Sequence, residues 1–219
     1  MRYILKMMTE WVVGLILLFI FSPGSFQQSY LVHRYSETEG LPSANVYDST
    51  QDHQGRMWFA TRSGIAVYDG VSWKKFTVAE GLPALGFGKI NLDARGRIWA
   101  LGGPRPGGIV VTYYDGSRWQ SLPGPDSNDF AYSYLTAFVL LDREEKTALP
   151  TLAVGTSDQG VAVWDQGKWH RLTGANGLLS SSVNGIVTLE GKFYAATDKG
   201  VSVFTRNLQV DNGLNQRLG

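Results

Sequence analysis

The sequence contains no cysteine, and this absence excludes disulfide bonds, cysteine nucleophiles and zinc sites built from cysteine. It also lacks an excess of charge, because 20 Lys and Arg residues nearly balance 19 Asp and Glu residues. Without clustered Lys and Arg there is no electrostatic reason to expect nucleic acid as a partner. Beyond residue 30 no long stretch places apolar residues at helical spacing, so a helical domain is not expected.

One long uncharged run, residues 11–21, follows Arg2 and Lys6 near the N-terminus. It is shorter than the about 20 apolar residues of a membrane-spanning helix, and it fits the apolar region of a secretory signal. We predict that residues 1–24 form a signal peptide or, as the alternative, an uncleaved N-terminal membrane anchor. Residues 25–219 are then expected outside the cytoplasm, in the periplasm or the extracellular space, and possible anchoring to the membrane stays open.

Short phrases recur along the rest of the chain. An aromatic residue, Asp, a turn and Trp occur in this order at 68–73, 114–119 and 164–169. The segment DHQGRMW at 52–58 matches DARGRIW at 93–99, a spacing of 41 residues, and EGLP recurs at the same spacing. Glycine and aromatic residues are plentiful, which favours short strands joined by tight turns. A period in the low forties with about four strands per unit is typical of a β-propeller blade.

We therefore predict an all-β fold, a β-propeller with four-stranded blades, of which about three are full and the fourth is degenerate. The blades fall at about 45–84, 85–131, 132–181 and 182–215. Residues 30–36 align with a fourth strand and are expected to close a ring by completing another blade. Because four blades close a ring only tightly, we expect an incomplete ring, at the front of a longer protein or in a truncated product.

Several residue groups are given structural interpretations. We expect Trp58, Trp99 and Trp164 to pack between blades, because a ligand site should break the repeat. The glycine-rich insertion at 102–108 lacks the Lys-Ser/Thr of a phosphate loop and is interpreted as an irregular loop. The insertion at 142–150, with its paired Glu residues, is expected to be a solvated, charged loop.

The repeat resembles the two-component regulator propeller family. The resemblance is carried by DxxGR[MI]W, ATxxG[IV], YDG and EGLP, and it extends over about residues 30–215, most completely in the first blade. It implies the periplasmic sensor region of a bacterial hybrid histidine kinase or related receptor, without the membrane helix and output domain that follow in such proteins. Family members include sensors of polysaccharide breakdown products, so an oligosaccharide or other small ligand is implied.

From this resemblance we expect an extracytoplasmic sensory region that binds a ligand or a partner and is not itself an enzyme. Two alternatives stay open: a propeller lyase or glycan-acting enzyme, and a secreted protein-interaction scaffold. A protein partner, a homodimer, and membrane attachment through the N-terminal segment or a missing C-terminal part are further expectations. No catalytic residue, metal or cofactor is expected, because the three histidines, His33, His53 and His170, fall at separate places in the repeat.

The geometry of a propeller indicates where a ligand would bind. Turns between second and third strands should share one face with the connections between blades, and loops on a rigid scaffold commonly carry function. Arg62 and Arg105 in particular are suited to binding a carboxylate. The candidate residues are Asn45, Arg62, Ser63, Phe87, Arg105, Tyr132, Asp158, Gln159, Asn184, Asp198 and Lys199.

Overall fold

The computed structural model describes residues 32–105, 108–125, 133–145, 148–211 and 213. The chain divides into two units, Met1–Arg34 and Tyr35–Gly219, and every described strand lies in the second unit. The predicted signal or anchor at 1–24 lies outside the described residues. Within the described ranges, no helix combines the length and the apolarity that crossing a membrane requires.

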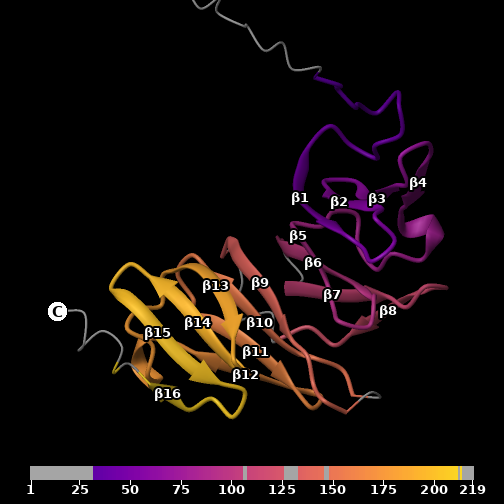
Figure 1. Ribbon diagram of the computed structural model, residues 1–219. Coiled ribbons are helices and arrows are strands. Elements are labelled where there is room, and N and C mark those ends of the chain that lie inside the picture. Colours follow the sequence, from indigo (N-terminus) through magenta and orange to yellow (C-terminus); the bar gives the residue numbers. More distant parts are fainter. Residues whose placement is uncertain (1–31, 106–107, 126–132, 146–147, 212, 214–219) are drawn as a thin grey trace, which may run out of the picture. The chain divides into compact units, whose positions relative to one another are not determined.

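Four antiparallel sheets of four strands follow one another in sequence order (Figure 1). In each sheet neighbouring strands are consecutive in the chain, as predicted for propeller blades. The first sheet consists of β1 (Val46–Gln51), β2 (Met57–Thr61), β3 (Gly64–Tyr68) and β4 (Trp73–Phe76), and the second of β5 (Lys89–Leu92), β6 (Ile98–Arg105), β7 (Gly108–Tyr114) and β8 (Trp119–Leu122). The third consists of β9 (Leu135–Leu141), β10 (Thr151–Thr156), β11 (Val161–Asp165) and β12 (Lys168–Leu172), and the fourth of β13 (Val183–Leu189), β14 (Lys192–Thr197), β15 (Gly200–Thr205) and β16 (Val210–Asp211). The predicted all-β propeller fold is confirmed, and over the described residues the sheets are not closed into a ring.

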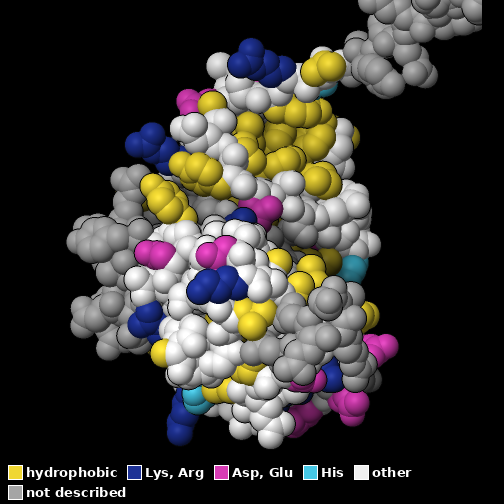
Figure 2. Space-filling view, turned by 90° about the vertical axis from the view of Figure 1, so that its left-hand side faces the viewer, with side chains coloured by type: hydrophobic (Ala, Val, Ile, Leu, Met, Phe, Trp, Pro, Cys, Tyr) yellow, Lys and Arg dark blue, Asp and Glu magenta, His cyan; other side chains and the backbone are white. Residues whose placement is uncertain are grey.

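The first sheet has one face that packs on the second sheet and one that does not. Because side chains alternate along a strand, the register of the first sheet puts Phe59, Ala66 and Lys75 in one row and Met57, Tyr68 and Trp73 in the next, on the same face. The Tyr35 ring packs on this face, 5.2 Å from the Tyr68 ring and 5.3 Å from the Trp73 ring. Figure 2 shows hydrophobic side chains gathered at the height of the first sheet, in the upper part of the view.

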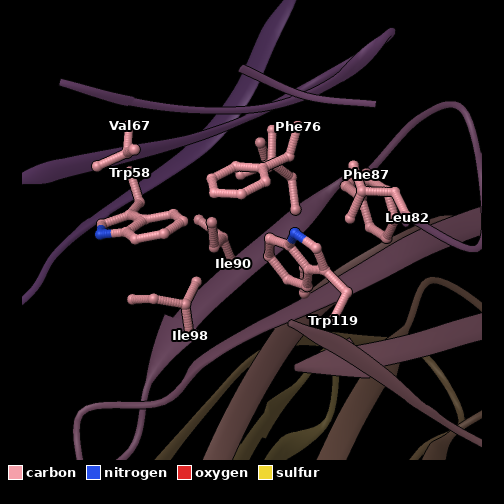
Figure 3. Close-up of a cluster of buried hydrophobic side chains, with 11 residues drawn as sticks. Trp58, Val67, Phe76, Leu82, Phe87, Ile90, Ile98 and Trp119 are labelled. Carbon is pink, nitrogen blue, oxygen red and sulfur yellow. The ribbon is translucent and has the colours of Figure 1, made fainter. Parts of the chain in front are cut away.

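The opposite face of the first sheet forms a hydrophobic core with the second sheet (Figure 3). Trp58 and Phe76 stack with their ring centroids 5.7 Å apart, and both rings lie against Trp119 of the second sheet. Two further clusters fill the space between the second and third sheets and between the third and fourth. The core role predicted for Trp58, Trp99 and Trp164 is confirmed, since their exposed fractions are 1%, 0% and 6%.

The DxxGRxW phrase is a turn held together by one carboxylate. Oδ1 of Asp52 accepts hydrogen bonds from the backbone amides of Gln54 (2.9 Å) and Arg56 (3.0 Å). Oδ2 accepts from Arg56 Nε (2.7 Å) and from the buried indole nitrogen of Trp58 (2.8 Å). The same four bonds recur in residues 93–99, at 2.6 to 3.0 Å. Asp and Trp therefore recur together in this phrase because the buried indole N–H needs a hydrogen-bond acceptor.

The EGLP phrase forms the connection that leads from one sheet to the next. Thr77 caps the short 3₁₀ helix η1 (Val78–Glu80), and the Glu80 carboxylate accepts from the Thr77 amide at 2.8 Å. The helix η2 (Gly174–Asn176) repeats this reciprocal cap, with an Asn amide in place of the carboxylate. The leucine of the phrase is buried each time: Leu41 is 5% exposed, Leu82 2% and Leu178 4%. Each connection is thus fixed to the core by a leucine.

Two loops and the N-terminal segment differ in part from what the sequence predicted. The insertion at 102–108 was expected to be an irregular loop, but its residues 102–105 continue β6 and Gly108 begins β7, with Arg105 paired to Gly108 after a register shift. The charged loop is only partly solvated, because the Arg143 guanidinium donates to the Asp165 carboxylate. In the segment 30–36, residues 32–36 form no strand in this structure, and its pairing in a closed ring stays a prediction.

Candidate functional site

The turns between second and third strands are built in the same way in three sheets. In the first sheet the buried Thr61 hydroxyl donates to the Gly64 carbonyl (2.8 Å) and accepts from the Ser63 amide (3.2 Å). Gly64 has a φ of 135°, and a Cβ there would lie 2.3 Å from the Phe76 carbonyl oxygen. Glycine is therefore required, and the threonine leaves Arg62 and Ser63 exposed at the tip of a fixed turn.

The third and fourth sheets repeat this turn. Thr156 Oγ1 donates to the Gly160 carbonyl at 2.8 Å, and Thr197 Oγ1 donates to the Gly200 carbonyl at 2.7 Å. The exposed tips are Asp158 in the third sheet and Asp198 and Lys199 in the fourth. Three of the four sheets thus present one or two charged residues in the same place.

Backbone hydrogen bonds tie each of these turns to the residue that precedes the first strand of the same sheet. The Arg62 amide donates to the Asn45 carbonyl (3.0 Å), and the Ser157 amide donates to the Tyr134 carbonyl (3.0 Å). In the fourth sheet the Asp198 amide donates to the Ser182 carbonyl at 3.4 Å. The turns and the starts of the first strands therefore share one end of each sheet, as the sequence predicted.

Neighbouring sheets are linked at this same end. The Phe87 amide donates to the Thr61 carbonyl at 3.0 Å, and a Cβ on Gly86 would lie 2.7 Å from the Arg62 carbonyl oxygen. Between the third and fourth sheets, the Gly160 amide donates to the Ser181 carbonyl at 2.8 Å. The exposed tips are consequently held in fixed positions relative to the next connection.

The predicted residues do not all point outward on this end. Phe87 is 1% exposed and packs in the core between the first two sheets, so its side chain is a packing residue and not a surface contact in this structure. Gln159 is half-buried, and its backbone carbonyl accepts from Arg171 Nε at 3.1 Å. Asn184 is exposed near the start of β13. Arg105 is the last residue of β6, and Tyr132 lies outside the described residues.

One aromatic residue at this end was missed by the sequence reasoning. Tyr134 is 80% exposed, and its backbone amide donates a hydrogen bond to Ser157 Oγ at 3.3 Å. The repeat contained a signal for Tyr134. In three sheets the carbonyl of the residue directly before the first strand accepts a hydrogen bond from an amide of the turn between the second and third strands. Counting back from the strands would have selected Tyr134 in place of Tyr132.

The electrostatics of the exposed tips are mixed in sign. Arg62 and Lys199 carry positive charge, and Asp158 and Asp198 carry negative charge. No group of three or more His, Asp or Glu side chains within the described residues is arranged to hold a metal ion. The described side chains at this end offer hydrogen-bond donors, hydrogen-bond acceptors and the aromatic ring of Tyr134.

Carboxylates with lowered pKa values lie elsewhere, in turns. Hydrogen bonds from the amides of Ser72 and Val71 and from the Ser72 hydroxyl lower the pKa of Asp69. Hydrogen bonds from the amides of Arg118 and Ser117, and then from the Ser117 hydroxyl and the Gln120 side chain, lower the pKa of Asp115 strongly. Both aspartates begin the turn of the repeated aromatic–Asp–Trp phrase, so their shifts reflect turn formation.

Comparison with known proteins agrees with this architecture. Residues 40–63 match the profile of the family described as two component regulator propeller. The sheets are therefore propeller blades, and the first carries a repeat of that family, as the sequence predicted. No curated protein matches the sequence significantly.

Several solved structures share the fold. The extracellular domain assigned to a hybrid two component system of B. thetaiotaomicron aligns with a TM-score of 0.60 and 21% identity, over 84% of this chain and 26% of that one. A second B. thetaiotaomicron extracellular domain, assigned to a one component system, aligns with a TM-score of 0.58 and 17% identity, over 80% and 22%. A gluconolactonase of Xanthomonas campestris aligns with a TM-score of 0.52 and 16% identity, over 77% and 61%. The chain spans about a quarter of the length of the two extracellular domains.

Proposed function

We propose that this chain is an extracytoplasmic sensory region of a bacterial two-component-type receptor, which binds a ligand or a partner. The observation that carries the proposal is the family repeat at residues 40–63. The likeness to extracellular domains of B. thetaiotaomicron signalling systems supports it. The N-terminal apolar run, with the basic residues before it, supports export of the chain.

The turn end of the sheets is the proposed binding surface. Its side chains stand on turns that buried threonines and positive-φ glycines hold in one conformation. Preorganised groups lose less conformational entropy on binding. Arg62 is suited to a bidentate pair with a carboxylate, and the exposed Tyr134 ring offers a flat apolar surface with a polar tip. An oligosaccharide that carries carboxylates combines these features.

The location of the protein is the first test. An antibody against residues 35–80 is used to probe cytoplasmic, periplasmic and membrane fractions of the native cells. We expect the band in the periplasmic or membrane fraction. A band confined to the cytoplasm contradicts the proposal, whatever the ligand is.

Binding is tested with two oligosaccharides of equal length, an acidic oligogalacturonate and a neutral cello-oligosaccharide. We expect the full chain to bind the acidic sugar more tightly in calorimetry. Arg62→Ala should weaken this binding about 10-fold or more, because a hydrogen bond to a charged group contributes about 1.5–3 kcal/mol. The control is Lys168→Ala, which removes an exposed cation from the β11–β12 hairpin instead.

The outcomes of these experiments test the proposed binding surface and the proposed sensory function separately. If Arg62→Ala and Lys168→Ala weaken binding of the acidic oligosaccharide equally, net charge alone explains the effect, and the proposed surface is contradicted. The enzymatic alternative is tested on glucono-1,5-lactone, since one similar structure is a gluconolactonase. Hydrolysis above the buffer rate that disappears with the boiled protein would favour the alternative.

A further inference from the structure

The turn between the second and third strands of the third sheet is one residue longer than its counterparts. The threonine and the glycine that hold this turn are three positions apart in the first and fourth sheets and four positions apart in the third. The amide of the residue before the glycine donates to the threonine hydroxyl each time, at 3.2 Å from Ser63 and Lys199 and at 3.0 Å from Gln159. Gln159 is therefore equivalent to Ser63 and Lys199, and the exposed Asp158 is the added residue.

A side chain from the outermost strand of the same sheet holds Gln159 in place. Arg171 lies on β12, and its Nε donates to the Gln159 backbone carbonyl at 3.1 Å. Its Nη2 donates to Oε1 of the Gln159 side chain. The Arg171 backbone is fixed in turn, because its carbonyl accepts from Asn176 Nδ2 at 2.8 Å. The guanidinium thus binds Gln159 at two points, one on the backbone and one on the side chain.

This contact decides which end of the Gln159 amide faces outward. A guanidinium carries only hydrogen-bond donors, so the amide atom that faces Arg171 is the oxygen. The amide nitrogen Nε2 is on the other branch, and within the described residues it has no hydrogen-bond partner. It does not belong to the buried polar atoms that lack a partner, so it is open to solvent. Gln159 therefore presents its two N–H donors at the tip of the third sheet.

The contact is a departure from the repeat. The residues in register with Arg171 are Lys75 in the first sheet and Ser121 in the second, and both are exposed. In the fourth sheet the described strand β16 is two residues long and pairs with the far end of β15, away from the turn. Packing that serves every blade should recur in every blade. A contact built into one blade is better explained by a task that is specific to that blade.

The exposed Tyr134 lies beside the same turn. The Ser157 amide donates to the Tyr134 carbonyl at 3.0 Å, and the Tyr134 amide donates to Ser157 Oγ at 3.3 Å. The added residue Asp158 follows directly, and the Ser157 hydroxyl donates to its carboxylate at 3.2 Å. An aromatic ring, a carboxylate and the fixed donors of Gln159 are therefore gathered at one end of the third sheet.

We propose that Arg171 is a positioning residue that holds Gln159 so that its Nε2 donates to an acceptor oxygen of the ligand. The inference rests on the proposed function, because it takes the turn end as the ligand-binding surface. A donor whose orientation is fixed before binding loses less entropy on binding. Gln159 is then a specificity residue, since a ligand that places a donor here leaves both groups unpaired.

The orientation of Gln159 is tested without a ligand, by ¹⁵N relaxation of its side-chain NH₂ group in the full chain. We expect this group to be as ordered as the neighbouring backbone. Arg171→Met should make it mobile, whereas Arg171→Lys keeps one donor for Oε1 and should restore part of the order. The control is Lys75→Met, which removes a cation at the equivalent position of the first sheet and should leave the Gln159 signals unchanged.

The specificity is tested by calorimetry with the acidic oligogalacturonate and the neutral cello-oligosaccharide. Gln159→Glu keeps an acceptor for Arg171 but replaces the outward donor by an acceptor, so binding of the acidic sugar should weaken about 10-fold or more. Arg171→Met should weaken it about 2- to 10-fold, which corresponds to ordering one free side chain. The control is Gln54→Glu, which adds the same charge to an exposed residue of the β1–β2 turn, at the other end of the first sheet, and should leave binding unchanged.

The outcomes distinguish this inference from the proposed function. Weakening of the acidic sugar alone by Gln159→Glu would identify the acceptor as a carboxylate, and equal weakening of both sugars would identify it as a hydroxyl; either result supports the inference. A Gln159 side chain that is mobile in the natural chain, or equally ordered after Arg171→Met, overturns it. If Gln159→Glu binds like Gln54→Glu while Arg62→Ala still weakens binding, the surface is correct and the role of Gln159 is wrong. If the natural chain binds neither sugar, the proposed surface is contradicted, and the specificity assigned to Gln159 is contradicted with it.

Discussion

The turn between the first and second strands is built differently in the first two sheets and in the fourth sheet, although it joins equivalent strands in all three. In the first two sheets Asp52 and Asp93 hold the turn, and a buried Trp lies six residues later. In the fourth sheet only Glu190 and Gly191 separate β13 from β14, and both have positive φ, 49° and 75°. That sheet has Tyr194 at the position of the tryptophan, and it has no aspartate at the turn.

The comparison shows which residues of the repeat depend on one another. A buried indole N–H costs free energy unless it has an acceptor, and the aspartate supplies it while also closing the turn. The third sheet keeps an aspartate at the start of this turn, since Asp142 directly follows β9, but the buried Ala153 stands at the tryptophan position. There the Asp142 carboxylate accepts from the Ala94 amide of the second sheet at 3.1 Å instead. The buried tryptophan therefore depends on the aspartate, whereas a blade forms without the tryptophan.

The largest effect is expected from Asp93→Ala. Asp93 is 1% exposed and accepts four hydrogen bonds, including one from Arg97 Nε at 2.6 Å and one from Trp99 Nε1 at 2.9 Å. Removing it leaves a half-buried guanidinium and a buried indole without their acceptor. We expect the free energy of unfolding to fall by about 3–5 kcal/mol, measured by urea denaturation with tryptophan fluorescence.

A double-mutant cycle with Trp99→Phe checks the assignment of this loss. If aspartate and tryptophan act as a unit, the double variant loses less than the two single changes together, with a coupling of about 0.5–3 kcal/mol. Additive losses would show that Asp93 acts through the turn alone and would remove the link between the two residues.

Asp52 gives a smaller effect that depends on pH. Burial raises the pKa of its carboxyl, but hydrogen bonds from Trp58, Arg56 and Gln54 outweigh burial, so the pKa lies below the ordinary 3.8. A lowered pKa in the folded state contributes stability above pH 3.8 that is lost as the pH falls through the lower value. Asp52→Asn should cost about 1–3 kcal/mol at pH 7.

The pH dependence of the stability loss distinguishes loss of the Asp52 charge from a general loss of packing. The difference in unfolding free energy between the natural chain and Asp52→Asn should narrow as the pH falls below 3.8 and through the lower folded-state pKa, because the carboxyl then becomes protonated in the folded state too. Urea midpoints between pH 2.5 and 7 measure it. A difference that is constant over this range would show that charge plays no part.

Much of the fold could be predicted because each repeated phrase corresponds to one local structure. The spacing of 41 residues, the DxxGRxW turn and the EGLP connection depend on short-range hydrogen bonds that the sequence states directly. The extended β6–β7 hairpin could not be predicted, since its glycines fit an irregular loop equally well. The two-residue strand β16 shows that the degenerate fourth blade still forms a fourth strand.

The candidate surface was predicted less completely than the fold. Arg62, Ser63, Asp158, Asp198 and Lys199 were placed correctly at the turn tips, because a threonine three or four residues before a glycine fixes those turns. Phe87 was misplaced, because a connection between blades has one side in solvent and the other in the core. A repeat period alone does not tell which side an aromatic residue takes.

The smallest effect is expected where the fourth sheet uses its tight turn. Glu190 holds a φ of 49°, in the left-handed region that an L-residue with a Cβ adopts at a cost, and Asn is preferred at this place in a two-residue hairpin turn. Glu190→Asn should therefore raise the free energy of unfolding by up to about 1 kcal/mol. The matched control is Glu144→Asn, an exposed Glu without positive φ, which should change stability by less than about 0.5 kcal/mol. If both variants shift the urea midpoint equally, loss of a negative charge explains the gain. A gain confined to Glu190→Asn would show that the fourth sheet pays in backbone strain for a turn that the first two sheets hold with a carboxylate.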